Sequence, residues 1–198
     1  MTVPEEVLQR EPYGPDLVEV IREDHAQVSD ALAHLVGVRD AAERRELFRA
    51  VVRQLSVHEA AEEEVVYPHL RGLGTEAVEV RNRRLEEERQ AKRLLARMLR
   101  QELLNPASRR FRRNLERLHS LVRAHAAAEE AEVLPLLTGA EGDTKLRLLA
   151  TLFDQAKATA PTRPHPHGPD RLGGLVVAAP VLAVVDRVRD YGRRLITG

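Results

Sequence analysis

Apolar residues recur at every third or fourth position over most of this chain, which is the pattern of amphipathic helices. The pattern predicts four long helices and a shorter fifth one. Their approximate ranges are Pro15–Val38, Ala42–Tyr67, Thr75–Leu104, 109–137 and Asp143–Ala158. Because the connections between them are short, neighbouring helices should run antiparallel. We therefore expect an all-α fold, an up-down-up-down antiparallel four-helix bundle with extra C-terminal helices.

Proline and glycine set the remaining boundaries. The stretch 159–174 contains four prolines and three glycines, so we predict an extended linker there. Residues 175–198 predict a last helix that docks on the bundle or on a partner, and a partner of the same sequence would make a homodimer. We expect an N-terminal extension at 1–14, the bundle at 15–140 and the additional helix at 141–158.

Composition restricts the possible partners. The chain has 198 residues, and 31 Lys and Arg balance 31 Asp and Glu. A zero net charge and few aromatic residues argue against nucleic acid as a partner. No segment has the apolar core of a signal peptide or the length of a membrane span, so we expect no membrane partner and a cytoplasmic location. With no cysteine in the chain, metal ligation falls to His, Asp and Glu.

An internal repeat is the most informative feature. The segment HEAAEEEVVYPHL at 58–70 aligns without gaps to HAAAEEAEVLPLL at 125–137, with eight of thirteen positions identical. Each copy has a His followed four residues later by a Glu, and these positions differ by only about 40° around a helix. Each pair therefore projects from one helix face. The pairs are His58 with Glu62 and His125 with Glu129.

The preceding helices supply one further candidate each. His25 in the first half and Glu88 in the second half both have large apolar residues seven and ten positions later, which makes them counterparts. The second and fourth helices of such a bundle run in the same direction, so the candidates can converge at one level. The six predicted metal ligands are His25, His58, Glu62, Glu88, His125 and Glu129.

Three imidazoles and three carboxylates in a bundle core indicate bound metal. Buried carboxylates at close range repel one another, and divalent or trivalent cations remove that conflict. Mixed His and carboxylate ligation with more than four donors suits iron or manganese better than structural zinc. Carboxylates that bridge two ions suit a dinuclear centre, and Glu62 and Glu129 are the natural bridges. In ferritin-type proteins Glu instead precedes His by three residues.

The doubled HxxxE motif, each followed by a proline, resembles the hemerythrin-like, or HHE cation-binding, domain over roughly residues 16–137. The resemblance implies a four-helix bundle with two non-haem iron ions, with or without an oxo bridge, in preference to manganese or zinc. Members of this family bind oxygen, sense iron or oxygen, react with peroxide or nitric oxide, or handle iron. Five of the six candidates match the family's ligands in kind.

Glu88 departs from the family pattern, which has a His there and a lysine four residues on, where this chain has Lys92. A carboxylate in place of an imidazole adds a negative charge, which stabilises ferric iron and lowers the reduction potential. We therefore rank redox chemistry or sensing above oxygen storage. Alternatively, Glu86 or Glu87 takes this position, or the site is partly lost and binds metal weakly.

We compare three functions that fit these observations. The first is a di-iron protein that binds or reacts with a small oxidant such as oxygen or peroxide, with oxidase-type or peroxide-consuming turnover left open. The second is an iron-sensing, oxygen-sensing or iron-handling module without turnover, and the third is a metal-free interaction scaffold.

Two further residues follow the predicted ligands directly. We expect Glu63 and Glu130 to face neighbouring helices, solvent or a ligand His. Tyr67 is expected in the core, where it could supply a proton or an electron.

Overall fold

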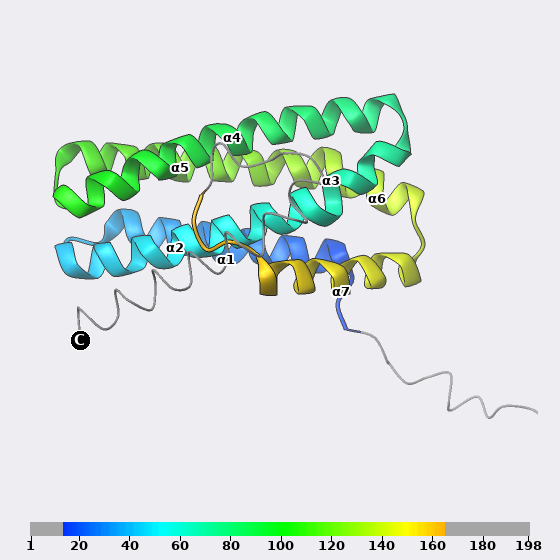
Figure 1. The fold of residues 1–198 in the computed structure, drawn as a ribbon, viewed down its shortest axis with the longest axis horizontal. Coiled ribbons are helices and arrows are strands. Elements are labelled where there is room, and N and C mark those ends of the chain that lie inside the picture. The colour runs from blue at the N-terminus through cyan, green and yellow to red at the C-terminus, as the bar shows by residue number, and fades with distance from the viewer. Residues whose placement is uncertain (1–13, 165–198) are drawn as a thin grey trace, which may run out of the picture.

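The computed structural model describes residues 14–164, and within this range every regular element is helical (Figure 1). The four long helices are α1 (Leu17–Gly37), α2 (Ala41–Ala61), α4 (Thr75–Leu104) and α5 (Arg109–Ala128). Shorter helices are α3 (Tyr67–Leu70), α6 (Leu134–Ala140) and the 3₁₀ turn η3 (Arg71–Leu73), and α7 (Asp143–Thr159) follows the bundle. The all-α fold class is thus confirmed.

Three predictions fall largely outside the residues that the structure describes. The N-terminal extension lies outside the described residues except for Gly14, and so does the C-terminal helix at 175–198. The predicted linker is described only as far as residue 164, and residues 160–164 are not helical. Among the residues described, no helix combines the length and apolar character that a bilayer-spanning segment needs.

Local chemistry sets the helix ends. Asp16 and Glu19 form a capping box at the start of α1, and Asp40 accepts hydrogen bonds from two backbone N–H groups at the start of α2. Ser108 caps α5 in the same way, through the backbone N–H of Phe111. The bounds of α4 match the predicted ones. The helix ends at Leu104 because Asn105 adopts the extended backbone that the following proline favours.

The long helices pack as an antiparallel bundle in which α1 contacts α2 and α5, and α4 contacts α5 and α2. Figure 1 shows α4 and α5 as one layer over α1 and α2, with α7 beside the second layer. α7 contacts α1, α2 and the segment after α2. In this arrangement α2 and α5, which carry the two repeat copies, run in the same direction.

Two apolar cores fill the bundle and flank the predicted ligands. On α1, Ile21 belongs to one core and Val28 to the other, and His25 lies between them. On α2, Leu55 and Ala61 bracket His58 in the same way. The polar cluster is therefore enclosed along the bundle axis by packed hydrocarbon, which excludes water from it.

The repeat region corrects one prediction. The second and fourth helices were expected to continue as α-helices to about Tyr67 and Leu137, but each contains a π-helical turn, at Glu62–Val66 (η2) and Glu129–Val133 (η4). In each turn a backbone N–H bonds to the carbonyl five residues earlier, that of the ligand Glu. A proline follows at 68 and at 135, and its ring would crowd the carbonyl four residues earlier in a regular helix. The wider turn relieves this conflict.

Candidate metal centre

The structure brings all six predicted ligands together in the bundle core. They form two groups whose ligand atoms all lie within 4.8 Å of one another: His25, His58, Glu62 and Glu129 in one, and Glu62, Glu88, His125 and Glu129 in the other. The groups share Glu62 and Glu129, the two residues expected to bridge. Each shared carboxylate is the first residue of a π-helical turn.

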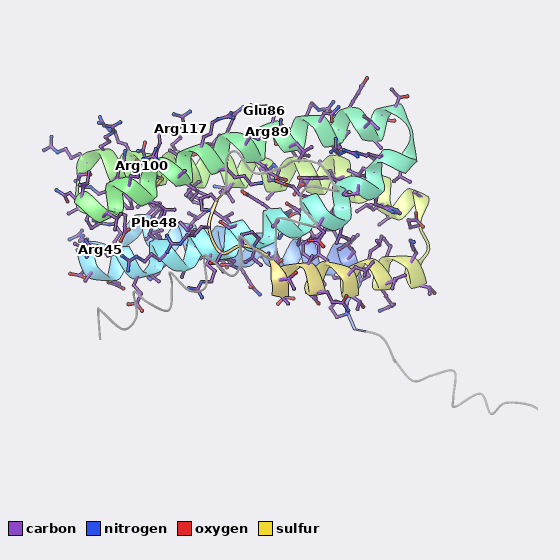
Figure 2. The ribbon with its side chains drawn as sticks, viewed as in Figure 1. Arg45, Phe48, Glu86, Arg89, Arg100 and Arg117 are labelled. Carbon is purple, nitrogen blue, oxygen red and sulfur yellow. The ribbon has the colours of Figure 1, made fainter. Side chains whose placement is uncertain are left out.

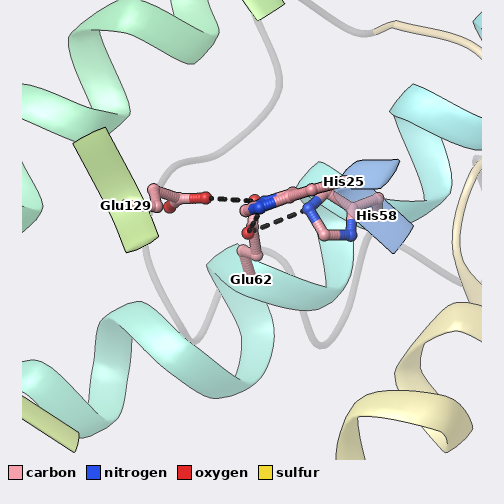
Figure 3. Close-up of side chains that lie close together, drawn as sticks. All are labelled: His25, His58, Glu62 and Glu129. Atoms are coloured by element: carbon pink, nitrogen blue, oxygen red, sulfur yellow. Dashed lines mark ion pairs between the residues drawn. The ribbon is translucent and has the colours of Figure 1, made fainter. Parts of the chain in front are cut away.

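Figure 3 shows the first group at close range. Nε2 of His58 lies 3.0 Å from Oε1 of Glu62, and Nε2 of His25 lies 3.3 Å from Oε2 of Glu129 and 4.0 Å from Oε1 of Glu62. In the second group, Nε2 of His125 lies 3.5 Å from Oε2 of Glu129. All three imidazoles thus direct Nε2 toward the shared carboxylates.

The cluster has the free donor atoms that a metal site requires. Although several of these atoms lie close to one another, each of the six residues has a buried nitrogen or oxygen that makes no hydrogen bond: Nε2 of His25, His58 and His125, Oε2 of Glu62 and Glu129, and Oε1 of Glu88. Unpartnered buried polar atoms are costly and rare in folded proteins. Six of them directed into one place fit cations well, since each atom would gain a ligand bond.

A second layer of carboxylates holds the imidazoles. Nδ1 of each ring hydrogen-bonds to one acidic side chain at 3.0 to 3.1 Å: His25 to Glu130, His58 to Asp24 and His125 to Glu87. Such a contact fixes the tautomer and orientation of the ring and raises its basicity as a ligand. Glu130 was among the residues considered for this role. The roles of Asp24 and Glu87 were not predicted.

The structure distinguishes between the three candidates on α4. Glu86 is exposed and ion-paired with Arg89 and Arg93, and Glu87 supports His125. Glu88 is 1% exposed and belongs to the cluster. Of the three, only Glu88 is brought to the metal-binding groups.

Lys92, one turn after Glu88, balances part of the negative charge. Its Nζ lies 3.2 Å from Oε2 of Glu88 and also contacts the carboxylates of Glu63 and Glu59. These acidic neighbours raise the pKa of Lys92 although burial opposes the shift, so the side chain is cationic. Glu63 therefore bonds to Lys92 across helices rather than to an imidazole.

Tyr67 is fully buried and donates a hydrogen bond of 2.6 Å to Oε1 of Glu129. Burial and the nearby carboxylates of Glu129 and Glu88 raise the pKa of this phenol well above its usual value. The hydroxyl therefore keeps its proton and presents it to a shared carboxylate. Its expected core position is confirmed.

The charges within the cluster are in conflict when only protein groups are considered. Burial and the neighbouring Glu129 raise the pKa of Glu62 well above its usual value, and burial raises that of Glu88. Burial acts on Glu129 in the same direction, but His125 and His25 overcome it and lower its pKa. Cations would remove the conflict by stabilising all three carboxylates in their ionised form.

The additional helix α7 contributes to the site. This contribution was not predicted from the sequence, because Lys157 and Phe153 belong to no motif. Nζ of Lys157 lies 2.8 and 2.6 Å from the two carboxylate oxygens of Asp24, which in turn supports His58. The Phe153 ring packs edge-on against the His58 ring, with centroids 5.7 Å apart. One ligand is therefore held from α1 and α7 as well as from its own helix.

A cavity of about 210 Å³ adjoins the cluster on the side of the second apolar core. Its walls include His25, His58 and His125, together with apolar side chains such as Val28 and Leu121. A small molecule in this space would contact both the imidazoles and hydrocarbon.

Comparisons with known proteins agree with this geometry. The family model for the Hemerythrin HHE cation binding domain matches residues 16–137. A DNA nickase from Nostoc sp. is 26% identical over 166 residues, which are 84% of this chain but only 44% of that protein. An uncharacterized hemerythrin-like protein from Schizosaccharomyces pombe is 24% identical over 173 residues, 87% of this chain and 84% of that one.

The fold is also found in a solved structure. The crystal structure of a Hemerythrin HHE cation binding domain-containing protein from Mycobacterium kansasii superimposes with a TM-score of 0.62. It shares 21% sequence identity, and the match covers 73% of this chain and 89% of the other. At this identity the likeness establishes the fold.

Proposed function

Because the chain belongs to the hemerythrin HHE cation-binding domain family, we propose that it holds two iron ions at this cluster and binds or reacts with oxygen, peroxide or a related small oxidant. The observation that carries the proposal is the pair of ligand groups that share Glu62 and Glu129. Two adjacent sites with two carboxylates in common suit two ions, and the unpartnered donor atoms support occupancy.

Some residues of the cluster would bind the iron ions, and others orient these ligands. His25 and His58 would complete one iron site, and Glu88 and His125 the other, with the shared carboxylates common to both. Iron, when bound, supplies electrons and Lewis acidity to the oxidant. The chain orients the imidazoles through the carboxylates on Nδ1 and holds a proton on the Tyr67 hydroxyl against Glu129. The flanking apolar cores exclude water, and the adjoining cavity leaves room for the oxidant.

Glu88 favours redox chemistry or sensing over reversible oxygen carriage. A third carboxylate adds negative charge to the ligand set, which favours the ferric state. Lys92 offsets part of this charge through its contact with Glu88.

A sensing or iron-handling role is the second candidate, favoured by one observation. His58 is joined through Asp24 to Lys157 on α7, outside the four-helix bundle. A change in the ligation of His58 would therefore alter the contacts that hold α7 on the bundle, and a partner could detect that change. A metal-free scaffold is disfavoured, because it would leave six buried donor atoms without partners.

The proposal does not include the nicking activity in the name of the Nostoc relative. Glu62, Glu88 and Glu129 are each 1% exposed. A phosphodiester within a nucleic acid backbone cannot approach ligands buried this deeply in the bundle.

Peroxide consumption tests the proposal and separates its two forms. Protein loaded anaerobically with ferrous iron is mixed with hydrogen peroxide, and iron oxidation and peroxide loss are followed together. We expect rapid oxidation, slowed at least about tenfold by His58→Ala, which removes a ligand. His69→Ala is the matched control, because His69 bonds to Glu141 away from the cluster. Peroxide loss beyond the amount that oxidises the iron indicates turnover, whereas a single oxidation indicates sensing or iron handling.

Equal oxidation rates in the wild type and His58→Ala would contradict the proposal.

Glu88→His provides a second comparison, with the exposed Glu86→His as its control. We expect only the former to raise the reduction potential of the bound iron, because it removes a buried negative charge. Spectroelectrochemical titration measures this difference.

A further inference from the structure

The helix pair α4 and α5 carries a concentration of exposed arginines. Between residues 93 and 117 the chain has eight arginines and two acidic residues, a net charge of 8 − 2 = +6. All eight are exposed. We call them the arginine surface: Arg93, Arg97, Arg100, Arg109, Arg110, Arg112, Arg113 and Arg117. The zero net charge of the whole chain conceals this separation.

Within the described residues, neither acidic residue of this stretch, Glu102 or the exposed Glu116, forms an ion pair with the arginine surface. Glu102 is fully buried, and its carboxylate is bound by Arg45 and Arg49 of α2 at 3.1 and 2.8 Å. Arg93 pairs with Glu86 at 3.0 Å. Within the part of the chain that the structure describes, the other seven arginines form no ion pair. Their guanidinium groups are thus available to an external anion.

Helical spacing arranges most of these arginines in two rows. On α4 they recur at 93, 97 and 100, and on α5 at 110, 113 and 117, so each row follows one helix face for about 10 Å. Nδ2 of Asn114 donates to Oε1 of Gln101 at 2.9 Å, which fixes the register of the antiparallel pair. In this register Arg97 and Arg100 lie near the level of Arg117 and Arg113, so the two rows overlap at these ends and together form a longer basic stretch. Figure 2 shows Arg100 and Arg117 over this end of α4 and α5.

We propose that the arginine surface binds the phosphate backbone of duplex nucleic acid. Guanidinium groups bind phosphate oxygens through paired hydrogen bonds, and a duplex presents one charge per about 1.7 Å of its axis. Phe111, the aromatic residue of this stretch, is fully buried, so the surface offers no ring on which single-stranded bases could stack. The duplex is therefore the fitting partner.

The same surface fits a membrane less well. Helices that bind a bilayer surface insert a continuous apolar face along their length. The apolar faces of α4 and α5 are packed inside the bundle, and the exposed large apolar side chains of this stretch are two neighbouring residues at the end of α4, Leu103 and Leu104. The expectation that nucleic acid is no partner rested on the zero net charge and on the few aromatic residues. The net charge averages this surface with acidic residues elsewhere, and aromatic rings serve to stack single-stranded bases rather than to bind a duplex. The inference is independent of the proposed iron chemistry, because none of these arginines belongs to the metal-binding groups.

Binding to a fluorescent 25-base-pair DNA duplex tests the inference. Anisotropy is measured with the full chain at salt concentrations from about 50 to 200 mM, for the wild type and two triple variants. The first variant is Arg97→Gln, Arg113→Gln and Arg117→Gln. The control, Arg71→Gln, Arg83→Gln and Lys145→Gln, removes the same charge elsewhere. Circular dichroism confirms that both variants remain folded.

We expect the wild type to bind more weakly as salt rises, and the first variant to bind at least about tenfold more weakly at 100 mM salt. Its slope of log affinity against log salt should be smaller by about 2 to 3, since each lost phosphate contact contributes about 0.9. The control should stay within about twofold of the wild type. Three results would overturn the proposal: no binding at 50 mM salt, equal loss in both variants, or preferential binding to vesicles of anionic phospholipid.

Discussion

At the scale of single residues, each imidazole of the cluster is fixed on one side and open on the other. His125 shows the consequence most clearly, because Glu87 bonds to its Nδ1 while Glu129 lies 3.5 Å from its Nε2. Burial opposes the charged form, but Glu129 and Glu87 outweigh it and raise the pKa of His125 to about 9. A cation needs the neutral ring, so metal binding must displace this proton.

The protein stripped of metal should therefore lose stability as pH rises from about 6.5 to 9. A His whose pKa is higher in the folded state binds more protons there than in the unfolded chain, so its contribution is complete below the unfolded pKa and lost above the folded one. The raised pKa values of Glu62 and Glu88 act with the same sign. Urea unfolding of chelator-treated protein should show a loss of up to about 3 kcal/mol from His125.

His125→Gln is the matched variant, and it should flatten this pH dependence. With iron bound the trend should reverse, because cation binding improves as protons leave the ligands. Constant or rising stability of the metal-free wild type over this pH range would show that His125 is not held between the two carboxylates.

The residues that could be predicted from sequence are those that the repeat marks. Two HxxxE pairs identify four candidates, and matching the halves adds His25 and Glu88. Asp24 and Glu87 immediately precede His25 and Glu88, but the partners they support are His58 and His125, each on another helix. Spacing along one helix cannot reveal such a contact, because it depends on how helices are rotated against one another.

At the scale of elements, two π-helical turns and the additional helix α7 shape the centre. The π-helical turns η2 and η4 both begin at a shared carboxylate, and both precede a proline. Helix α7 closes one side of the bundle, with Phe153 fully buried against His58. Apolar periodicity predicted where helices lie, but it does not distinguish a π turn from an α turn. It also does not show where a fifth helix docks.

Docking of α7 leads to a prediction about stability. Phe153→Ala should lower the free energy of unfolding by about 3 to 5 kcal/mol, because it leaves a cavity beside His58. Leu152→Ala, at the neighbouring position, should cost less than about 1 kcal/mol, since Leu152 is 42% exposed. Urea unfolding of the two variants measures the difference, and similar losses would mean that α7 does not pack as described.

At the scale of the whole molecule, the chain separates two kinds of charge. Buried carboxylates gather at the metal-binding groups, and exposed arginines gather on α4 and α5. The balanced total of 31 basic and 31 acidic residues hides both concentrations. The fold makes this separation possible, because the bundle encloses its acidic cluster between two apolar cores while leaving the other helix faces to solvent.

The central claim is that six side chains form one centre for two ions. The most direct test is the number of iron ions retained per chain after anaerobic loading with ferrous iron and removal of excess metal by gel filtration. The account predicts two per wild-type chain, and fewer in Glu62→Ala, which removes a ligand common to both groups. Retention of one iron or none by the wild type would contradict it.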